Sequence, residues 1–238
     1  MSLSVTQLAG FGVGGATGIG GIDSFTKLML HFDGADGSTT CTDSSSFART
    51  MTRTGGPEID TAQSKFGGSS GLFNSGRWQA PDDADLELGS NDFTIDMWVR
   101  ASSWAGSYHI IFARGGASDY WTGFIHNGTS LYFPGTTNNS AYGFSALSAI
   151  TGVTLATNTW HHIAAVRSGN NLYLFFDGVL KETRSVTGLS VYNFGHGWCV
   201  GSTNDGGSTF AGWIDELRVS IGVARWTSDF TPPTAPYS

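Results

Sequence analysis

The run of residues 158–184, NTWHHIAAVRSGNNLYLFFDGVLKETR, constrains the fold more than any other part of this 238-residue chain. It predicts three consecutive antiparallel strands, at His161–Arg167, Leu172–Phe176 and Val179–Glu182. The last two strands are joined by Asp177-Gly178. Asp-Gly is favoured in two-residue hairpin turns because both positions need positive φ angles. A chain with this meander is expected to fold as an antiparallel β protein.

Short apolar segments separated by Gly, Asn, Asp and Ser recur along most of the remaining chain. In FTIDMWVR (93–100) the residues alternate, with Phe93, Ile95, Met97 and Val99 on one face of a predicted strand. Further strands are predicted at Lys27–Phe32, Phe66–Phe73, Trp78–Ala80, His109–Ala113, Tyr120–His126, Ser130–Phe133, Gly197–Gly201 and Thr209–Ser220. Residues 134–159 are less regular and are expected to form long loops. No long helix is predicted, so the pattern indicates an all-β, two-sheet antiparallel sandwich.

Residues 1–24 differ from the rest of the chain. The segment FGVGGATGIGGIDS (11–24) has Gly at nearly every second position, and such a composition buries too little apolar surface to order itself. The sequence therefore predicts a Gly-rich N-terminal arm at 1–24 and one domain at 25–238. We expect the arm to bind partner subunits through its apolar residues, which are Phe11, Val13, Ile19 and Ile22.

Composition excludes several classes of partner and location. The net charge is −7 and the 12 Lys and Arg residues form no cluster, so nucleic acid is not an expected partner. No apolar run is long enough to cross a bilayer, so no membrane insertion is expected. The first cation is Lys27, so we expect no signal peptide. Cys41 and Cys199 are expected to be free thiols, buried at Cys199, in preference to a disulfide bridge.

Three stretches carry a family resemblance: GLFNSGRWQAPDDADLELGSNDFTIDMWVRA (71–101), TWHHIAAVRSGNNLYLFFDGVLKE (159–182) and residues 200–238. In order and spacing they resemble the laminin-G-like, concanavalin A-type jelly rolls. The ending GVARWTSDFTPPTAPY (222–237) resembles that of such domains in tailed-bacteriophage virion proteins. The resemblance implies two antiparallel sheets that bind carbohydrate or protein, often near a structural Ca²⁺. The chain departs from the family at Asn74 and Cys199.

The resemblance also suggests a metal ligand. It implies that Asp215, in the segment Ile-Asp-Glu-Leu-Arg, helps to hold Ca²⁺ together with backbone carbonyls. Asp33, in an early polar loop, is a second candidate, because hard oxygen ligands suit this ion. The alternative for Asp215 is turn chemistry and an ion pair with Arg218.

The same architecture also occurs in glycosidases, which need two acids flanking the scissile bond. Asp83, Asp85 and Glu87 have the spacing of residues on one strand face and loosely resemble a glucanase signature. Pro81 and the segment 89–91 bracket them as a connection, so solvated acids are favoured over a catalytic triple. Asp215 and Glu216 are adjacent and are expected on opposite faces of their strand. We therefore expect no enzymatic activity.

Several aromatic residues lie in or beside predicted turns: Trp104, Tyr108, Tyr120, Trp121 and Tyr192 are the candidate ligand-binding residues. An aromatic ring offers a flat apolar face that suits a pyranose ring, and it suits a protein interface equally well. Packing of the loops onto the domain is the alternative for each of them.

These observations predict a non-enzymatic virion structural protein, assembled in the host cytoplasm, that decorates a capsid, forms a fibre or is associated with a tail. The arm would bind other virion proteins, and the lectin-like domain would bind host-surface polysaccharide. Many copies, or a homo-oligomer, would strengthen weak single sites. A capsid cement protein without sugar binding and a glycosidase or depolymerase are the alternatives.

Overall fold

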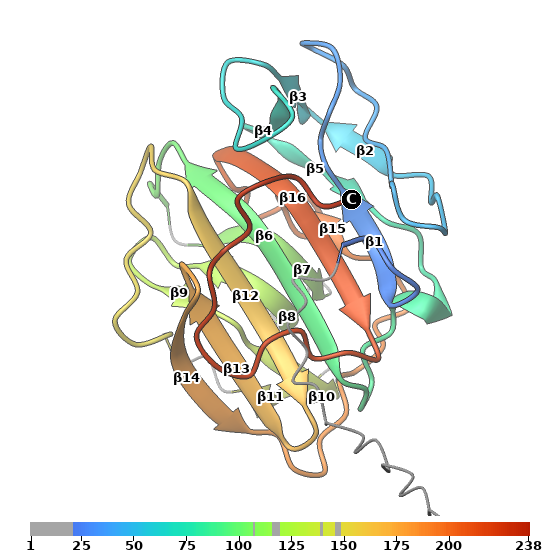
Figure 1. Cartoon of the computed structure of the whole chain (residues 1–238), viewed down its shortest axis with the longest axis vertical. Coiled ribbons are helices and arrows are strands. Elements are labelled where there is room, and N and C mark those ends of the chain that lie inside the picture. Colours follow the sequence, from blue (N-terminus) through green and yellow to red (C-terminus); the bar gives the residue numbers. More distant parts are fainter. Residues whose placement is uncertain (1–20, 107, 116–119, 139, 146–148) are drawn as a thin grey trace, which may run out of the picture.

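The computed structural model describes residues 21–106, 108–115, 120–138, 140–145 and 149–238. Two antiparallel sheets face each other in a sandwich (Figure 1), which confirms the predicted fold class. The eight-stranded sheet has the order β14-β13-β12-β6-β16-β4-β3, and β1 pairs with the part of β16 that β4 leaves free. Its strands are β1 (Thr26–Leu30), β3 (Glu58–Asp60), β4 (Ser70–Phe73), β6 (Phe93–Ala101), β12 (His161–Ser168), β13 (Asn171–Phe176), β14 (Val179–Ser185) and β16 (Gly212–Ile221).

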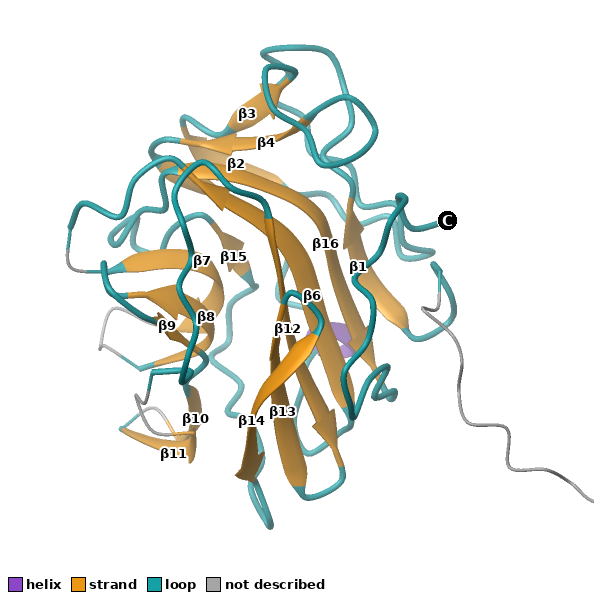
Figure 2. Cartoon of the chain, turned by 60° about the vertical axis from the view of Figure 1, so that its left-hand side comes forward, coloured by secondary structure: helices purple, strands orange, loops and turns teal. Residues whose placement is uncertain are grey.

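The six-stranded sheet has the order β2-β5-β15-β7-β8-β9. Its strands are β2 (Thr52–Gly55), β5 (Gly76–Gln79), β7 (His109–Gly115), β8 (Trp121–His126), β9 (Leu131–Tyr132) and β15 (Cys199–Val200). A separate hairpin of β10 (Gly135–Asn138) and β11 (Ala141–Ser145) lies at one end of this sheet (Figure 2). The described residues contain a single short helix, the 3₁₀ turn η1 (Ala84–Leu86).

The predicted meander is confirmed as β12, β13 and β14. Asp177 and Gly178 have φ angles of 49° and 78°, as a two-residue hairpin turn with right-handed twist requires. The strand predicted at Phe66–Phe73 begins only at Ser70, because Gly67 and Gly68 form a turn with positive φ angles. The long loops predicted for residues 134–159 are wrong in part, because β10 and β11 lie there.

The main core fills the space between the two sheets. The four residues of β6 that are expected on one face are all fully buried in this core: Phe93, Ile95, Met97 and Val99. From the other sheet, the rings of Phe112 and Trp198 stack with centroids 4.8 Å apart. Cys41 and Cys199 are both free and buried, and burial raises the pKa of both thiols.

Residues 222–238, hereafter the strap, run across the outer face of the eight-stranded sheet (Figure 1). The rings of Trp226 and Phe230 stack with centroids 3.9 Å apart and pack on Ala164, Val166 and Phe175. The strap also covers the second face of β6. That sheet is therefore buried on both sides over much of its area.

Candidate functional site

The acids that could form a glycosidase site do not converge. Asp83 caps η1 by accepting a hydrogen bond from the backbone amide of Asp85 at 2.9 Å, and it forms an ion pair with Arg49 at 2.9 Å. Glu87 instead lies 3.4 Å from the guanidinium of Arg114. Each ion pair fixes its carboxylate in a separate place. The sequence spacing of the triple therefore produces no pair of facing acids.

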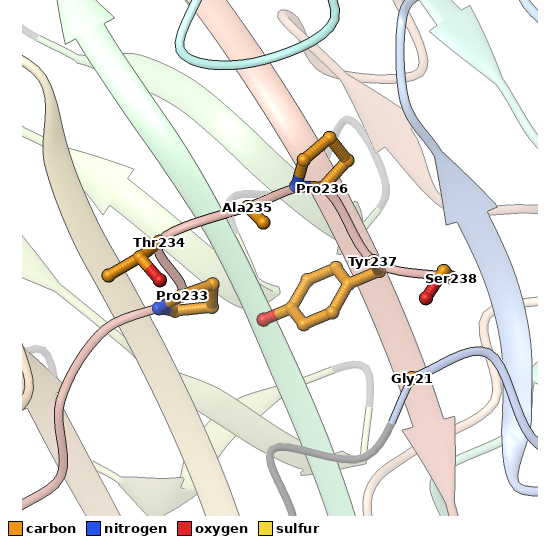
Figure 3. Close-up of a pocket in the computed structure, with 7 residues that line it drawn as sticks. All are labelled: Gly21, Pro233, Thr234, Ala235, Pro236, Tyr237 and Ser238. Carbon is orange, nitrogen blue, oxygen red and sulfur yellow. The ribbon is translucent and has the colours of Figure 1, made fainter.

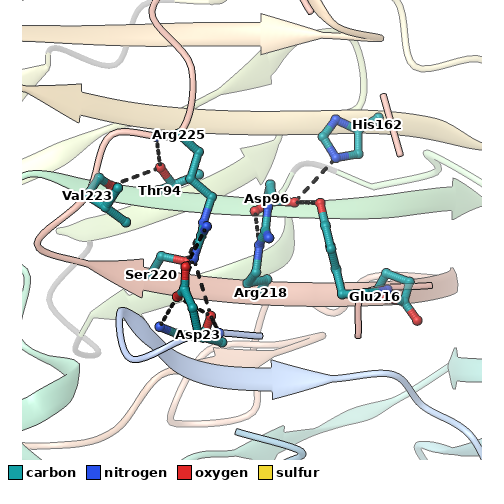
Figure 4. A network of polar contacts seen from close by, with 11 residues as sticks. Asp23, Thr94, Asp96, His162, Glu216, Arg218, Ser220, Val223 and Arg225 are labelled. Carbon is teal, nitrogen blue, oxygen red and sulfur yellow. Dashed lines mark hydrogen bonds and ion pairs between the residues drawn. The ribbon is translucent and has the colours of Figure 1, made fainter. Parts of the chain in front are cut away.

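The outer face of the eight-stranded sheet holds a buried polar network under the strap (Figure 4). Asp96 on β6 is fully buried and accepts hydrogen bonds from Arg218 at 3.0 Å and from the hydroxyl of Tyr237. His162 lies 3.4 Å from the same carboxylate. Burial opposes ionisation, but Arg218 and His162 outweigh it and hold the pKa of Asp96 at about 2. The network is closed by protein groups, so this face is a structural feature and not an open ligand site.

Both ends of the described domain meet on the strap side. Arg225 forms an ion pair with Asp23 at 2.9 Å, and the backbone amide of Ile22 donates to the carbonyl of Ser238 at 3.0 Å. Ile22 and Asp23, predicted to belong to the arm, are thus hydrogen-bonded to the domain. Phe11, Val13 and Ile19 lie outside the described residues.

A hollow of about 250 Å³ lies beside this junction (Figure 3). It is lined by Gly21 and residues 233–238, none of which carries a charged side chain. Prolines and backbone make up most of its wall. The hollow therefore offers few side-chain groups that could orient a ligand.

Asp215 and Glu216 occupy an irregular part of β16. The register with β6 shifts between Asp215 and Arg218, and Glu216 has a φ angle of 51°. This β-bulge places both acids on the strap side, where Glu216 accepts from His31 at 2.7 Å and from the amide of Tyr237 at 2.9 Å. The expectation that the two acids lie on opposite faces is therefore wrong, because a bulge interrupts strict alternation.

The fit of Ca²⁺ can be tested at the fully buried Asp215. One of its oxygens accepts from the amides of Lys65 and Phe66 at 2.7 and 3.1 Å, and the other has no hydrogen-bond partner among the described residues. Burial raises the pKa of Asp215 to about 7. Asp33 lies against the same turn, since a Cβ at Gly67 would be 2.0 Å from its Oδ1. Arg218, the alternative partner of Asp215, pairs instead with Asp96.

The described residues contain no group of three acidic, His or Cys side chains arranged for a metal. Ca²⁺ takes about six to eight oxygens, many of them backbone carbonyls. Asp215, with its unpaired buried oxygen, therefore fits a Ca²⁺ ligand provided that carbonyls of the 61–69 loop supply most of the remaining ligands.

The outer face of the six-stranded sheet carries the strongest candidate site. Phe112 on β7 points into the core, whereas its neighbour Ala113 belongs to a second apolar cluster with Ile110, Trp121 and Ile125. Trp121 is 8% exposed and its indole N–H has no hydrogen-bond partner among the described residues. The cluster is thus a small buried apolar layer on the side of the sheet that faces away from the core.

One exposed ring and two half-buried rings lie over this layer. The ring of Tyr108 is 6.1 Å from that of Trp121, and Tyr108 is 40% exposed. Tyr142 on β11 packs against the same cluster, and its ring lies 5.1 Å from that of Tyr120. Three of the five predicted ligand-binding residues, Tyr108, Tyr120 and Trp121, are therefore brought together on one face.

The polar side chains of Gln79 and Asn204 belong to the same face of the sheet. In the register of the sheet, Gln79 on β5 pairs with Cys199, which pairs with Ala113. Gln79 therefore lies in the same row as Ala113, two strands away. Its amide donates to Asn204 at 2.9 Å, and its oxygen accepts from Arg77 at 3.3 Å. Apolar rings beside amide groups are what a sugar needs, because it has both apolar faces and hydroxyls.

The structure places Trp104 and Tyr192 differently. Trp104 donates from its indole to the carbonyl of Leu155 at 2.8 Å, and its ring stacks on His126 at 3.7 Å. Burial and the nearby His109 lower the pKa of His126 to about 4, so His126 is neutral at pH 7 and packs against Trp104 as an uncharged ring. Tyr192 lies at the rim of the sandwich, 37% exposed, beside Phe194 at 5.2 Å. Sequence reasoning missed Gln79 and Asn204, which only the strand register brings to this face.

Comparison with known proteins agrees with this architecture. The family model of the concanavalin A-like lectin/glucanases superfamily matches residues 72–224. A search of curated proteins finds no match. Among the described residues, no helix is long and apolar enough to cross a membrane.

Solved structures with a similar fold include two toxin binding domains and one domain of an arabinanase. The binding domain of botulinum neurotoxin serotype G is 16% identical, with a TM-score of 0.61 over 86% of this chain and 48% of that one. The binding domain of Paraclostridial Mosquitocidal Protein 1 is 13% identical, with a TM-score of 0.61 over 82% of this chain and 48% of that one. This chain therefore spans about half the length of these toxin domains.

The third structure is domain 4 of AbnA, a GH43 extracellular arabinanase from Geobacillus stearothermophilus, in complex with arabinotriose. It is 20% identical, with a TM-score of 0.60 over 84% of this chain and 93% of that one. At identities this low, the three likenesses show a common fold and nothing finer.

Proposed function

This chain belongs to the concanavalin A-like lectin/glucanases superfamily, and on that premise we propose that it is a carbohydrate-binding domain. Its site is the outer face of the six-stranded sheet, around Tyr108 and Trp121. The observation that carries the proposal is an exposed aromatic ring next to a buried indole, on the same face of the sheet as the Gln79–Asn204 amide pair. Domain 4 of AbnA, a similar fold of similar length, was solved with a short glycan.

The geometry favours binding over catalysis. Among the described residues, Asp82, Asp83 and Glu87 are held in ion pairs with Arg49 and Arg114, so Asp85 has no unpaired acid of this segment to act with. Asp96 is ionised but sealed under the strap. A domain with these features is expected to hold a glycan and release it unchanged.

The biological setting that we propose is a virion. The Gly-rich segment 1–20 would bind other virion proteins, and many copies of the sandwich would face host-surface polysaccharide. The phage-like ending 222–237 and the composition of the arm support this setting. Multiple copies raise the effective concentration of weak sites by orders of magnitude. A Ca²⁺ ion held through Asp215 is proposed as a structural component, with no role in sugar contact.

Glycan arrays with the multivalent wild-type domain test the sugar-binding proposal. We expect binding that the Tyr108→Ala variant loses at least tenfold. Phe25→Ala is the matched control, because Phe25 is 43% exposed but lies before β1, away from this face. Absence of binding at high multivalency would favour a capsid cement protein, since the same rings would suit a protein interface.

Deletion of residues 1–20 tests the virion setting. The deletion stops before Ile22 and Asp23 because both are hydrogen-bonded to the domain. We expect the truncated protein to keep its melting temperature and to be missing from purified particles. Particles that still incorporate it would contradict the role of the arm.

A further inference from the structure

We propose that the site takes an extended, neutral, linear polysaccharide over several sugar units, and not a single terminal sugar. This inference rests on the proposed function and deepens it. It is carried by two groups of aromatic side chains on either side of β10, hereafter together the aromatic band, one on the outer face of the six-stranded sheet and one on the rim. The band consists of Tyr108, Trp121, Tyr142, Tyr192 and Phe194.

The first part of the band lies on the sheet. Tyr108 and Trp121 are 6.1 Å apart between ring centroids, and Tyr142 packs against the cluster that contains Trp121. Tyr120 widens the band at this point, with its ring 5.1 Å from that of Tyr142. The indole N–H of Trp121 is left without a partner among the described residues. This part of the band by itself would hold a short glycan.

The second part connects the sheet to the rim through β10. Thr136 on β10 is paired in register with Tyr142 on β11. On the other side of Thr136, its carbonyl accepts from the amide of Tyr192 at 2.9 Å. Neighbouring strands lie about 4.8 Å apart, so the backbones of Tyr142 and Tyr192 are separated by about 10 Å. The two tyrosines therefore flank a single extended segment.

The third part lies on the rim loop. Tyr192 is 37% exposed, its ring is 5.2 Å from Phe194, and Phe194 is 5.7 Å from His196. The loop is fixed in position, because Arg114 donates to the side chain of Asn193 at 2.8 Å and to the carbonyl of His196 at 2.6 Å. The rim rings are thus held on the same frame as the rings on the sheet.

The charges along the band decide the class of glycan. Arg114 is nearly fully buried and forms an ion pair with Asp82 and a weaker one with Glu87. It is therefore already neutralised and presents no cation to an acidic sugar. A uronic acid or sialic acid would meet the partly exposed carboxylate of Asp82. Neutral sugar units avoid this repulsion and stack their apolar faces on the rings.

The length of the band decides between a single sugar and a chain. One sugar unit covers one ring or one pair of rings, so a unit on Tyr108 would leave the other exposed ring of the band, Tyr192, in water. A linear polysaccharide repeats its apolar faces along its length, so each further unit can cover another ring. Affinity should therefore increase with the number of sugar units, since a tenfold change in affinity requires only about 1.4 kcal/mol.

The experiment begins with affinity electrophoresis of the full chain in gels that contain neutral or acidic linear polysaccharides, including arabinan, xylan, mixed-linkage glucan and a polyuronate. Calorimetry then follows oligosaccharides of one to six units from the polysaccharide that retards the protein most. We expect a neutral polysaccharide to cause the strongest retardation, and affinity to rise at least tenfold from the shortest oligosaccharide that binds to the hexasaccharide.

Two variants locate the contacts along the band. Tyr192→Ala should weaken hexasaccharide binding about tenfold and leave the shortest binding oligosaccharide unaffected, whereas Tyr108→Ala should weaken both. Phe25→Ala is the control, and melting temperatures check folding. Length-independent affinity, a Tyr192→Ala variant that binds hexasaccharide normally, or retardation by the polyuronate alone would overturn this inference while the proposed function stands. No retardation by any polysaccharide, together with a blank glycan array, would overturn both.

Discussion

Replacing Tyr237 by phenylalanine tests whether the strap is held on the sheet by the buried network. The substitution removes one hydroxyl that donates to Asp96 and keeps the ring, which lies 3.7 Å below the guanidinium of Arg218. Asp96 is fully buried and ionised, so the lost bond is of the charge-assisted kind. Such bonds contribute about 1.5–3 kcal/mol. We therefore expect the free energy of unfolding to fall by about 2 kcal/mol.

The effect should appear as a melting temperature lower by about 4–8 °C, because a chain of this size loses about 2–4 °C per kcal/mol. It should also depend on pH. The pKa of Asp96 is about 2 in the folded protein, below its ordinary 3.8. Its contribution is therefore complete above pH 4 and is lost as the pH falls through about 2. In the variant the loss should be complete at a higher pH, since one donor to the carboxylate is missing and the pKa of Asp96 in the folded protein is raised.

Urea unfolding measured between pH 2 and pH 8 provides the assay. Tyr173→Phe is the matched control, because Tyr173 is half-buried on β13 and its hydroxyl accepts only a 3.3 Å hydrogen bond from the neutral Asn171. We expect the control to stay within about 0.5 kcal/mol of the wild type. If Tyr237→Phe were no less stable than Tyr173→Phe, the reasoning about the strap would be refuted.

Three further predictions follow from the same structure. Asp215→Asn should raise the melting temperature at pH 8 without Ca²⁺. Burial raises the pKa of Asp215 to about 7, so the folded protein loses stability as the pH rises through this value and the buried carboxyl becomes charged, and the neutral amide avoids this loss. Added Ca²⁺ should raise the melting temperature of the wild type and not that of this variant. A thermal shift assay in which Ca²⁺ left the wild-type melting temperature unchanged would contradict a Ca²⁺ site at Asp215. Gly178→Ala should destabilise by at least about 1 kcal/mol in urea titrations, since Gly178 has a φ of 78° and a Cβ there would lie 2.0 Å from the carbonyl of Phe230. Incubation with polysaccharide should release no reducing ends, and release that Glu87→Gln abolished would contradict the binding-only role.

Much of the fold can be predicted because its signals are local. The Asp177-Gly178 turn and the alternation of Phe93 to Val99 each lie within a few residues, so periodicity and turn chemistry suffice. The β10–β11 hairpin was missed because its strands, GTTN and AYGFS, are too short and too polar to alternate clearly. The bulge at Glu216 was missed because an ordinary acidic residue takes the positive φ angle.

The candidate site was predictable only in part. Position beside turns selected Tyr108 and Trp121, which share a face, and it selected Trp104 for the same reason. Trp104 instead turns toward Leu155 and His126. That difference depends on contacts between residues distant in sequence. The position of Gln79 on this face could likewise not be predicted, because only the pairing of β5, β15 and β7 brings it into the row of Ala113.

The hydrogen bond between Ile22 and Ser238 determines from which side the domain can be attached to a larger assembly. Ile22 and Ser238 therefore lie at one point of the sandwich, on the strap side. The tyrosines and tryptophan of the six-stranded sheet lie on the opposite side. A partner that bound the chain ahead of residue 21, as proposed above, would therefore lie behind the sandwich and leave the face of Tyr108 and Trp121 accessible.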